Sequence, residues 1–444
     1  MPRHSQQELP QQRVKAGQAQ RKRVPRAAHA EWDPKLRGAT DAPLTLLARS
    51  MEGRLPALVR IKYQRMLASP FGFFRGAVPV MAADLSRVPH TLLITQICGD
   101  AHVRNFGAYA ALDGRTVFDI NDFDESVRAP FEWDIKRMAA SIIVAGRDAH
   151  SRDTVCEEAA RSFLTGYRKR IHLFAKMPVL DVARHQIHGL QSDDAVEEAW
   201  QKARRSTPLQ TLALLTEHIR GKKSGARKFR NQRPLLFRVH GREAEEVLTS
   251  LKKYRECLRP ERRHFLDQYR AVDVGFKVVG TGSVGLRDYV VYLEGNSPAD
   301  PLFIQIKEEP PSAYTAYLPA ALQALVAPPL HQGQRVADAQ RAMQLESDPF
   351  LGYTSISGRD YLVRQLNDHK GSINPADLKG DVLVEYAVVC GDLLARGHAR
   401  SGDVCQLSGY LGNSARFDDA LAKFALAYAD QTERDWKELK KARK

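Results

Sequence analysis

The chain has 444 residues, 43% hydrophobic and 27% charged, which is typical of a folded protein with a large core. No stretch reaches the roughly 20 apolar residues of a membrane-spanning helix, and no apolar segment follows the basic N-terminus, so we expect neither a membrane protein nor a secretory signal. Lys and Arg outnumber Asp and Glu by 67 to 52, for a net charge of +15. The five cysteines form no CxxC pair, which favours free thiols in a reducing cytoplasm.

Two segments carry much of the positive charge. Residues 1–38 are polar and Gln-rich around Arg21-Lys22-Arg23, and we predict a disordered basic arm that makes weak nucleic-acid contacts. Residues 222–230 form a second basic patch, within a predicted insertion near 220–235. A solubilising tail and an exposed loop are the simpler explanation, because no nucleic-acid-binding motif accompanies the charge.

The first half of the chain is mainly helical in pattern. Apolar spacing predicts a helix over 44–67, and the Pro and two Gly of residues 69–76 predict an irregular loop. Residues 92–97 and 116–120 are predicted strands. A helix follows from Asp134, where apolar residues recur at helical spacing.

The second half changes to β and then returns to helix. Apolar or β-branched runs predict four strands, at 276–279, 289–293, 303–306 and 361–366. Further patterns predict three helices, at 331–346, 379–398 and 417–440. We therefore expect an α+β fold with four parts: the arm 1–38, a helical lobe 39–265, a β-rich lobe 266–370 and C-terminal helices 371–444 that complete the helical lobe.

Two loops gather acidic and amide side chains. Residues 99–107 read Gly-Asp-Ala-His-Val-Arg-Asn-Phe-Gly, which places Asn105 five residues after Asp100. Asp122 and Asp124 follow the strand 116–120. Metal-assisted phosphoryl transfer needs a carboxylate at the acceptor hydroxyl and carboxylate or amide ligands for the cation. We therefore predict Asp100 as the catalytic residue, with Asn105, Asp122 and Asp124 as metal ligands.

A glycine-rich segment lies far downstream, between two predicted strands. Gly280, Gly282, Ser283 and Gly285 suit a flexible hairpin over nucleotide phosphates, since a dinucleotide fold would place a helix after the third Gly. Lys307 stands in an apolar strand and must reach water, a carboxylate or a phosphate.

The acidic partner of this lysine is not determined by the pattern. The helix that follows offers two acidic residues, Asp338 and Glu346, and the spacing does not decide between them.

These motifs, with Ser-Pro-Phe-Gly-Phe-Phe-Arg-Gly at 69–76, resemble the bacterial domain-of-unknown-function family 2252 over nearly the whole chain after the leader. Residues 99–139 are similar to the catalytic segment of aminoglycoside and choline phosphotransferases, of the protein-kinase-like superfamily. That similarity implies ATP and Mg²⁺ as cofactors, Asp100 as catalytic Asp, and Asn105 and Asp122 as metal ligands. Cys98 stands where those enzymes usually have His.

The order of the motifs departs from that of kinases, in which the glycine loop and lysine precede the catalytic loop. A circular permutation of a two-lobed protein-kinase-like fold explains the order, with helix 379–398 left at the carboxyl end. A rival assignment makes residues 398–403, His-Ala-Arg-Ser-Gly-Asp, the catalytic loop in normal order. It requires Asn where Ser408 stands, so we prefer the permuted interpretation.

We therefore expect a cytoplasmic kinase-like transferase that moves a phosphoryl group from ATP to a small-molecule or protein hydroxyl. Transfer of AMP by the same fold is an alternative, and so is a nucleotide-binding sensor or scaffold that uses the basic arm. A metal-dependent hydrolase built on His102 ranks last, because it gives Lys307 and the glycine loop no role. The acceptor is not encoded in any motif that we identify.

Overall fold

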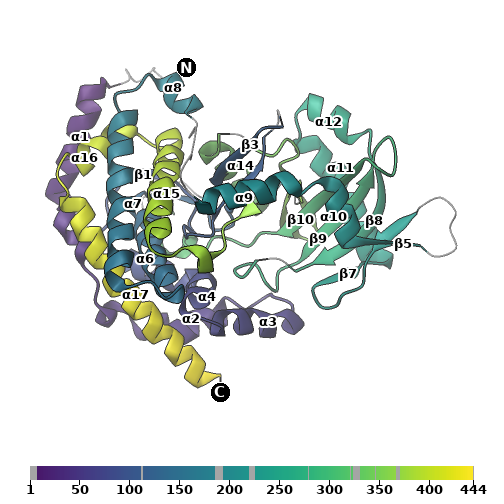
Figure 1. The fold of residues 1–444 in the computed structure, drawn as a ribbon, viewed down its shortest axis with the longest axis horizontal. Helices are drawn as coiled ribbons and strands as arrows, with labels where there is room; N and C mark the ends of the chain where they lie inside the picture. Colours follow the sequence, from purple (N-terminus) through teal and green to yellow (C-terminus); the bar gives the residue numbers. More distant parts are fainter. Residues whose placement is uncertain are drawn as a thin grey trace.

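The computed structural model describes residues 8–111, 114–185, 194–219, 226–278, 280–320, 322–323, 331–345, 347–366 and 371–443. It is an α+β fold, as predicted, with helices gathered on one side and a sheet on the other (Figure 1). No helix among the described residues is both long and apolar enough to cross a membrane. All five cysteines are free.

The helical region is organised around one buried helix. It consists of α6 (Glu132–Asp148), α7 (Asp153–Phe174), α8 (Val179–Arg184), α15 (Asp381–Ser401), α16 (Val404–Leu411) and α17 (Arg416–Ala442). Helix α6 is buried from Glu132 to Gly146, and α4, α7 and α17 pack around it. Because α6 is enclosed on all sides, polar groups on it must find partners inside the protein.

Shorter helices precede α6 in the chain. They are α1 (Pro10–Arg23), α2 (Pro43–Arg49), α3 (Pro56–Leu67), α4 (Pro70–Gly76) and α5 (Val78–Arg87). Helix α3 extends below the space between the helical region and the sheet (Figure 1). Its Leu58 belongs to the hydrophobic core of the sheet, whereas Tyr63 and Met66 pack with α2 and α4, so α3 joins the two regions.

The sheet region is a six-stranded antiparallel sheet in the order β11-β12-β10-β9-β8-β7. The strands are β7 (Leu236–Arg238), β8 (Arg270–Lys277), β9 (Asp288–Glu294), β10 (Pro301–Glu308), β11 (Gly352–Ile356) and β12 (Arg359–Gln365). Alternate side chains of β10 enter different cores: Ile304 and Ile306 lie in one, and Phe303 lies in the other. By the same alternation Lys307 lies on the face opposite Ile306.

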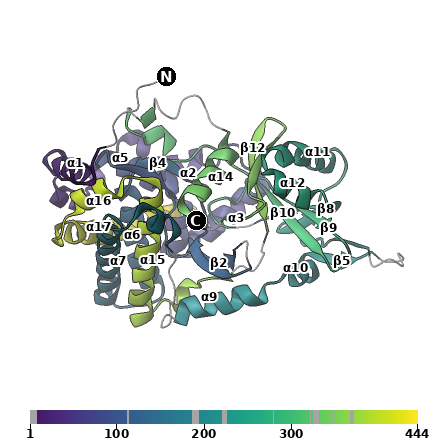
Figure 2. The same cartoon turned by 90° about the horizontal axis from the view of Figure 1, so that it is seen from above.

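Helices cover both faces of this sheet. Helices α11 (Gly241–Cys257) and α12 (Pro260–Leu266) pack on one face and α10 (Pro208–Leu215) on the other, while α14 (Gln332–Met343) packs against β11 and β12. Seen from above, α9 (Asp194–Arg205) runs from the helical region toward α10 (Figure 2). The sheet region therefore begins before residue 266, because helices predicted for the helical lobe pack on the sheet.

Three small sheets hold the loops and one hairpin. Strand β1 (Ile94–Ile97) pairs with β4 (Val127–Pro130), and β2 (Phe106–Ala110) lies between β3 (Thr116–Ile120) and β13 (Gly371–Ser372). Strands β5 (Thr216–His218) and β6 (Arg227–Phe229) pair within the predicted basic insertion, of which residues 220–225 lie outside the described ranges.

The loop predicted at 69–76 is instead the helix α4. The Ser69 hydroxyl accepts a hydrogen bond from Gly72 N at 3.0 Å, and Pro70 occupies the first helical position. Serine followed by proline is a helix-start signal, because it satisfies a free backbone N–H and fixes the first φ angle. The Pro and Gly content of the segment concealed this signal.

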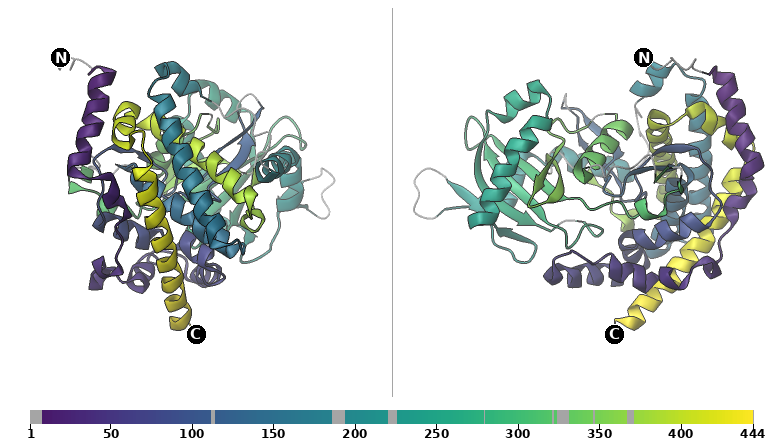
Figure 3. Two further views of the ribbon diagram at one scale, coloured as in Figure 1. Left: turned by 60° about the vertical axis from the view of Figure 1, so that its left-hand side comes forward. Right: turned by 180° about the vertical axis from the view of Figure 1, so that it is seen from behind.

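The disordered arm is also a wrong prediction for the described residues 8–38. Helix α1 packs against α16, at the outer edge of the helical region (Figure 3). Arg21 Nε donates to Tyr410 O at 2.9 Å, and Arg26 Nη1 donates to Leu411 O at 2.6 Å. Both arginines thus satisfy free carbonyls at the C-terminal end of α16, where a positive charge is also favoured.

Candidate active site

The Asp100 loop joins β1 to β2 and is held by α6. Asp134, in the first turn of that helix, accepts hydrogen bonds from Cys98 N at 2.8 Å and Gly99 N at 2.9 Å. Gly99 has a φ of +78°, and a Cβ there would lie 2.1 Å from Glu125 O, so the tight approach requires glycine. Arg137 of α6 donates to Asp100 Oδ1 through Nε at 2.9 Å. The core helix therefore sets the position of the predicted catalytic carboxylate.

Asn105 ties the two acidic loops together. Its Nδ2 donates to Asp100 O at 3.1 Å and to Asp122 O at 2.9 Å. The Asn105 Oδ1 atom is buried and has no hydrogen-bond partner among the described residues. A buried acceptor without a donor is uncommon in folded proteins, and a bound cation would satisfy it.

Lys307 lies against the acidic loops from the opposite side. Its Nζ contacts Asp124 Oδ2 and lies 4.0 Å from Asp122 Oδ1 and 3.8 Å from Glu309 Oε1. Burial alone would lower the pKa of Lys307, but Asp124, Asp122 and Glu309 raise it. Burial opposes ionisation of Asp124 as well, yet Lys307 lowers the pKa of that carboxyl to about 2. The pair is therefore ionised at neutral pH.

The partner of Lys307 is not on the helix that follows. Asp338 is on α14 but forms an exposed pair with Arg341, and Glu346 lies outside the described residues. Helix α14 instead contributes Arg335, which donates to Asp124 O at 2.9 Å. Sequence distance was misleading here, because the acidic partner comes from a loop 183 positions earlier.

The glycine loop between β8 and β9 is anchored from below by α3 and the residues before it. Lys62 donates to Gly282 O and Arg65 donates to Gly280 O. Arg54 Nη1 donates to Val284 O at 2.7 Å. Three cationic side chains thus hold the carbonyl groups of one loop.

A narrow cavity lies between these parts. Six of the predicted residues line it: Asp100, Asp122, Asp124, Gly280, Gly282 and Ser283. The other three are adjacent: Lys307 contacts Asp124, Asn105 bonds to the backbone of Asp100 and Asp122, and Gly285 precedes the lining residue Leu286. The structure therefore brings the early acidic loops and the late glycine loop to one cavity.

The oxygen atoms of Asn105, Asp122 and Asp124 fit a magnesium ion whose remaining coordination positions a bound ligand would fill. Within the described ranges, no three His, Cys, Asp or Glu side chains are arranged to hold a metal by themselves. Asp124 Oδ1 is buried without a hydrogen-bond partner there, as is Asn105 Oδ1, and the side chain of Asp122 is 48% exposed. Mg²⁺ typically takes one or two carboxylates and completes its shell with water and phosphate oxygens.

Two other polar residues of the acidic loops have structural roles. His102 Nε2 lies 3.6 Å from Asp100 Oδ2, and His102 Nδ1 accepts from Arg104 N at 3.1 Å. Burial, only partly offset by Asp100, lowers the pKa of His102 to about 4, so the ring is neutral at pH 7. Asp119, in β3 before the Asp122 loop, pairs with Arg396 of α15.

The rival catalytic loop at 398–403 does not reach the cavity. Asp403 is the N-cap of α16 and accepts from Cys405 N at 3.0 Å. His398 lies behind the Asp100 loop, with Nε2 3.4 Å from Asp134 Oδ2. The end of α15 thus packs against the Asp100 loop without contributing to the cavity.

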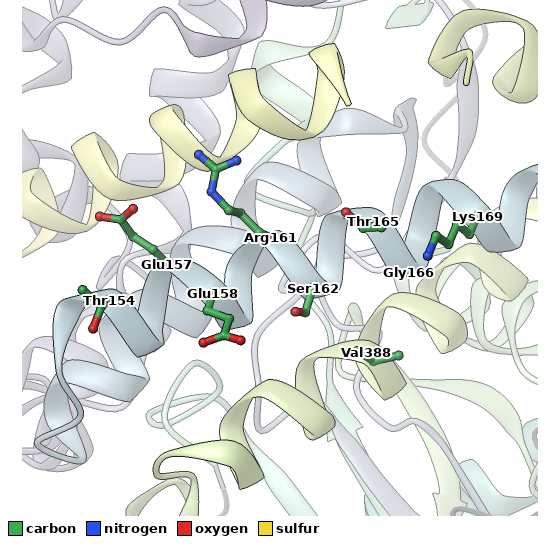
Figure 4. A pocket seen from close by; sticks show the side chains of 9 residues that line it. All are labelled: Thr154, Glu157, Glu158, Arg161, Ser162, Thr165, Gly166, Lys169 and Val388. Carbon is green, nitrogen blue, oxygen red and sulfur yellow. The ribbon is translucent and has the colours of Figure 1, made fainter. Parts of the chain in front are cut away.

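A separate hollow lies on the surface of α7. Its lining consists of Thr154, Glu157, Glu158, Arg161, Ser162, Thr165, Gly166 and Lys169 of α7 with Val388 of α15 (Figure 4). None of the predicted site residues is present, and its lining is mostly one exposed helix face. The cavity below the glycine loop is therefore the candidate active site.

Several site residues were not found from the sequence. Glu309 is buried, and neither of its carboxylate oxygens has a hydrogen-bond partner in the described part of the chain. Its position two residues after Lys307, directly past the end of β10, would have identified it, because extended residues two apart share a face. Lys62 and Arg65 carry no such signal, since their target loop is more than 200 positions away.

Comparisons with curated proteins and with solved structures gave no match. A family model matches residues 54–442, which include every residue that lines the cavity. The chain therefore belongs to DUF2252, a family described as uncharacterised proteins conserved in bacteria.

Proposed function

We propose that this protein is an ATP- and magnesium-dependent transferase that moves a phosphoryl group to a hydroxyl acceptor. The observation that carries the proposal is the meeting of Asp100, Asp122 and Asp124 with Lys307 and the glycine loop at one cavity. These groups come from two parts of the chain that are more than 150 residues apart, and the fold brings them to the same place. Phosphoryl transfer uses this set of groups to position phosphates and neutralise their charge.

Each group has a defined role in this proposal. Lys307 and the glycine loop would hold the phosphates, and Asn105, Asp122 and Asp124 would hold magnesium, which neutralises phosphate charge when bound. Asp100, oriented by Arg137, would position the acceptor hydroxyl and take its proton. In this structure Lys307 is paired with Asp124. Binding of a metal to Asp124 would therefore require the Lys307–Asp124 contact to lengthen.

We also propose that the fold is a circularly permuted protein-kinase-like fold. In support, the end of α15 packs beside the start of the Asp100 loop: His398 lies 3.4 Å from Asp134, which caps that loop. Ser401 Oγ also lies 3.4 Å from Gln96 O of β1. If a kinase-like chain were cut between the end of α15 and the start of β1, and its original termini were joined, its motifs would follow the order seen here.

Isothermal titration of Mg–ATP into wild type and Asp122→Ala tests the function. We expect saturable binding to the wild type and at least tenfold weaker binding to the variant. Asp338→Ala, which removes an exposed aspartate, is the matched control and should bind as the wild type does. Equal heats for wild type and Asp122→Ala, or no heat with either, would reject the proposal.

A further inference from the structure

The charges around the cavity do not pair off completely. Asp100 is paired with Arg137, and Asp124 is paired with Lys307. Arg54 also lines the cavity, but its guanidinium donates to two backbone carbonyls, those of Ser50 and Val284. Arg75, the second arginine of the lining, has neither a carboxylate within ion-pair distance nor a carbonyl acceptor among the described residues.

Arg75 comes from α4 and stands beside the predicted catalytic residue. Its Nε lies 3.4 Å from His102 Nε2, and His102 in turn lies 3.6 Å from Asp100. Arg104, in the same loop as Asp100, is exposed and lies outside the cavity lining, and its guanidinium forms no hydrogen bond or ion pair with a described residue. Burial and the neighbouring Arg104 lower the pKa of Arg75 to about 10, against the opposing effect of Asp100 and Asp122.

Arg75 is half-buried without an ion-pair partner, and the charge of Arg104 adds to the cost of keeping it ionised. Like charges repel, and a half-buried cation has also lost part of its hydration. An oxyanion placed between them would relieve both costs, and a guanidinium binds phosphate or carboxylate oxygens through paired N–H groups. The arrangement therefore fits a ligand anion on the Asp100 side of the cavity.

We propose that Arg75 and Arg104 bind an anionic group of the acceptor, so that the acceptor is a phosphorylated or carboxylated alcohol. This inference rests on the proposed function. The acceptor hydroxyl oxygen would form a bond to the terminal phosphorus of ATP while the bond from that phosphorus to its bridging oxygen breaks. ADP leaves with the electron pair of the broken bond, and the hydroxyl proton passes to Asp100. The cationic amino groups of an aminoglycoside would be repelled by the same arginines.

Titration of inorganic phosphate into protein saturated with Mg²⁺ and a non-hydrolysable ATP analogue tests this site. The analogue fills the position of the terminal phosphate, so that added phosphate reports the second anion site. We expect phosphate to bind the wild type and to bind Arg75→Met at least tenfold more weakly, with analogue affinity within twofold of wild type. Arg104→Met should weaken phosphate binding at least threefold. Because this position is exposed, the variant should fold normally and keeps the test valid if Arg75→Met misfolds. Arg60→Met, on exposed α3 surface, is the control for lost charge.

Two results would overturn the inference. One is absence of phosphate binding to the wild type. The other is competition between phosphate and the analogue, with Arg75→Met weakening both, because Arg75 would then serve the nucleotide. If the analogue fails to bind the wild type, the proposed function fails, and phosphate titrated into nucleotide-free protein decides the anion site separately: heat that depends on Arg75 supports it, and its absence rejects it.

Discussion

The two sides of the cavity are built in different ways. The acidic side, formed by the loops around Asp100 and Asp122, is fixed by the buried helix α6 through Asp134 and Arg137. The glycine loop is held by Lys62 and Arg65, which reach its carbonyls from a neighbouring helix. A side fixed by the core keeps its geometry, whereas a loop held by long side chains opens at lower cost.

This difference suggests a division of labour. On the acidic side Asp100 acts at the reacting atoms, so its change should affect turnover, whereas loss of a metal ligand such as Asp122 also weakens Mg–ATP binding. The glycine loop and its anchors cover the phosphates, so changes there should affect affinity. Two of the predictions below test this division, and two test the buried charges of the sheet that faces the acidic side, from the largest expected effect to the smallest.

Asp100→Asn should slow turnover and leave nucleotide binding intact. Loss of a general base costs about 10²- to 10⁴-fold in rate, while the amide keeps the shape of the side chain. The rate of ADP release from Mg–ATP measures the effect, with Asp338→Asn as the exposed control. A wild-type rate in Asp100→Asn, or a parallel loss of affinity, would remove the acidic side from the chemistry.

Lys307→Met should destabilise the protein strongly. Removing one partner of a buried ion pair costs about 3–5 kcal/mol, because the other charge stays buried, and Asp124 and Glu309 would both remain. Urea unfolding measures the free energy. Adding Glu309→Gln to the Lys307→Met variant should recover part of the loss. If the double variant is no more stable than Lys307→Met, the charge of Glu309 is not stabilised by Lys307.

Asp288→Asn should stabilise the protein above pH 6. Asp288 is buried and accepts from Gln305 Nε2 at 2.9 and 2.8 Å, and burial raises its pKa to about 6. Because the folded pKa exceeds the unfolded value of about 3.9, the wild type loses stability as pH rises between the two values. The free energy of unfolding of the variant should exceed that of the wild type by about 3 kcal/mol at pH 7 and should equal it below pH 4. A pH-independent difference would contradict this assignment.

Arg65→Met should weaken Mg–ATP binding slightly and leave global stability unchanged. One hydrogen bond to the Gly280 carbonyl is lost, which corresponds to about 1 kcal/mol, or roughly fivefold in affinity. Titration calorimetry measures the affinity. Comparison with Arg60→Met, on the same helix, separates loss of the hydrogen bond to Gly280 from loss of one positive charge. An effect as large as that of Asp122→Ala would show that both sides are equally rigid.

Much of the fold is local enough to be read from the sequence. Strand β3 spans the predicted residues 116–120, α15 is shifted from the predicted helix by two or three residues, and α17 extends its predicted helix by one or two. The Asp100 and Asp122 loops follow strand ends, where turn chemistry is visible in the sequence. Such features depend on residue patterns within ten or twenty positions.

Apart from the local error at α4, the errors concern contacts between distant segments. Helix α1 is polar along its length, so nothing in it indicates that Arg21 would cap α16 across 389 positions. The partner of Lys307 was sought on the following helix, yet Asp124 supplies it from an earlier loop. Polar partners such as these are selected by the assembled fold, and no periodicity in the sequence encodes them.

Hydrogen exchange with and without Mg–ATP tests the central claim most directly, because it needs no variant and reads both sides of the cavity at once. If one nucleotide sits between the two sides, amide exchange should slow together over residues 98–105 and 280–287, while the distant hairpin strand β6 stays unchanged. Slower exchange on one side alone, or on neither, would contradict the account.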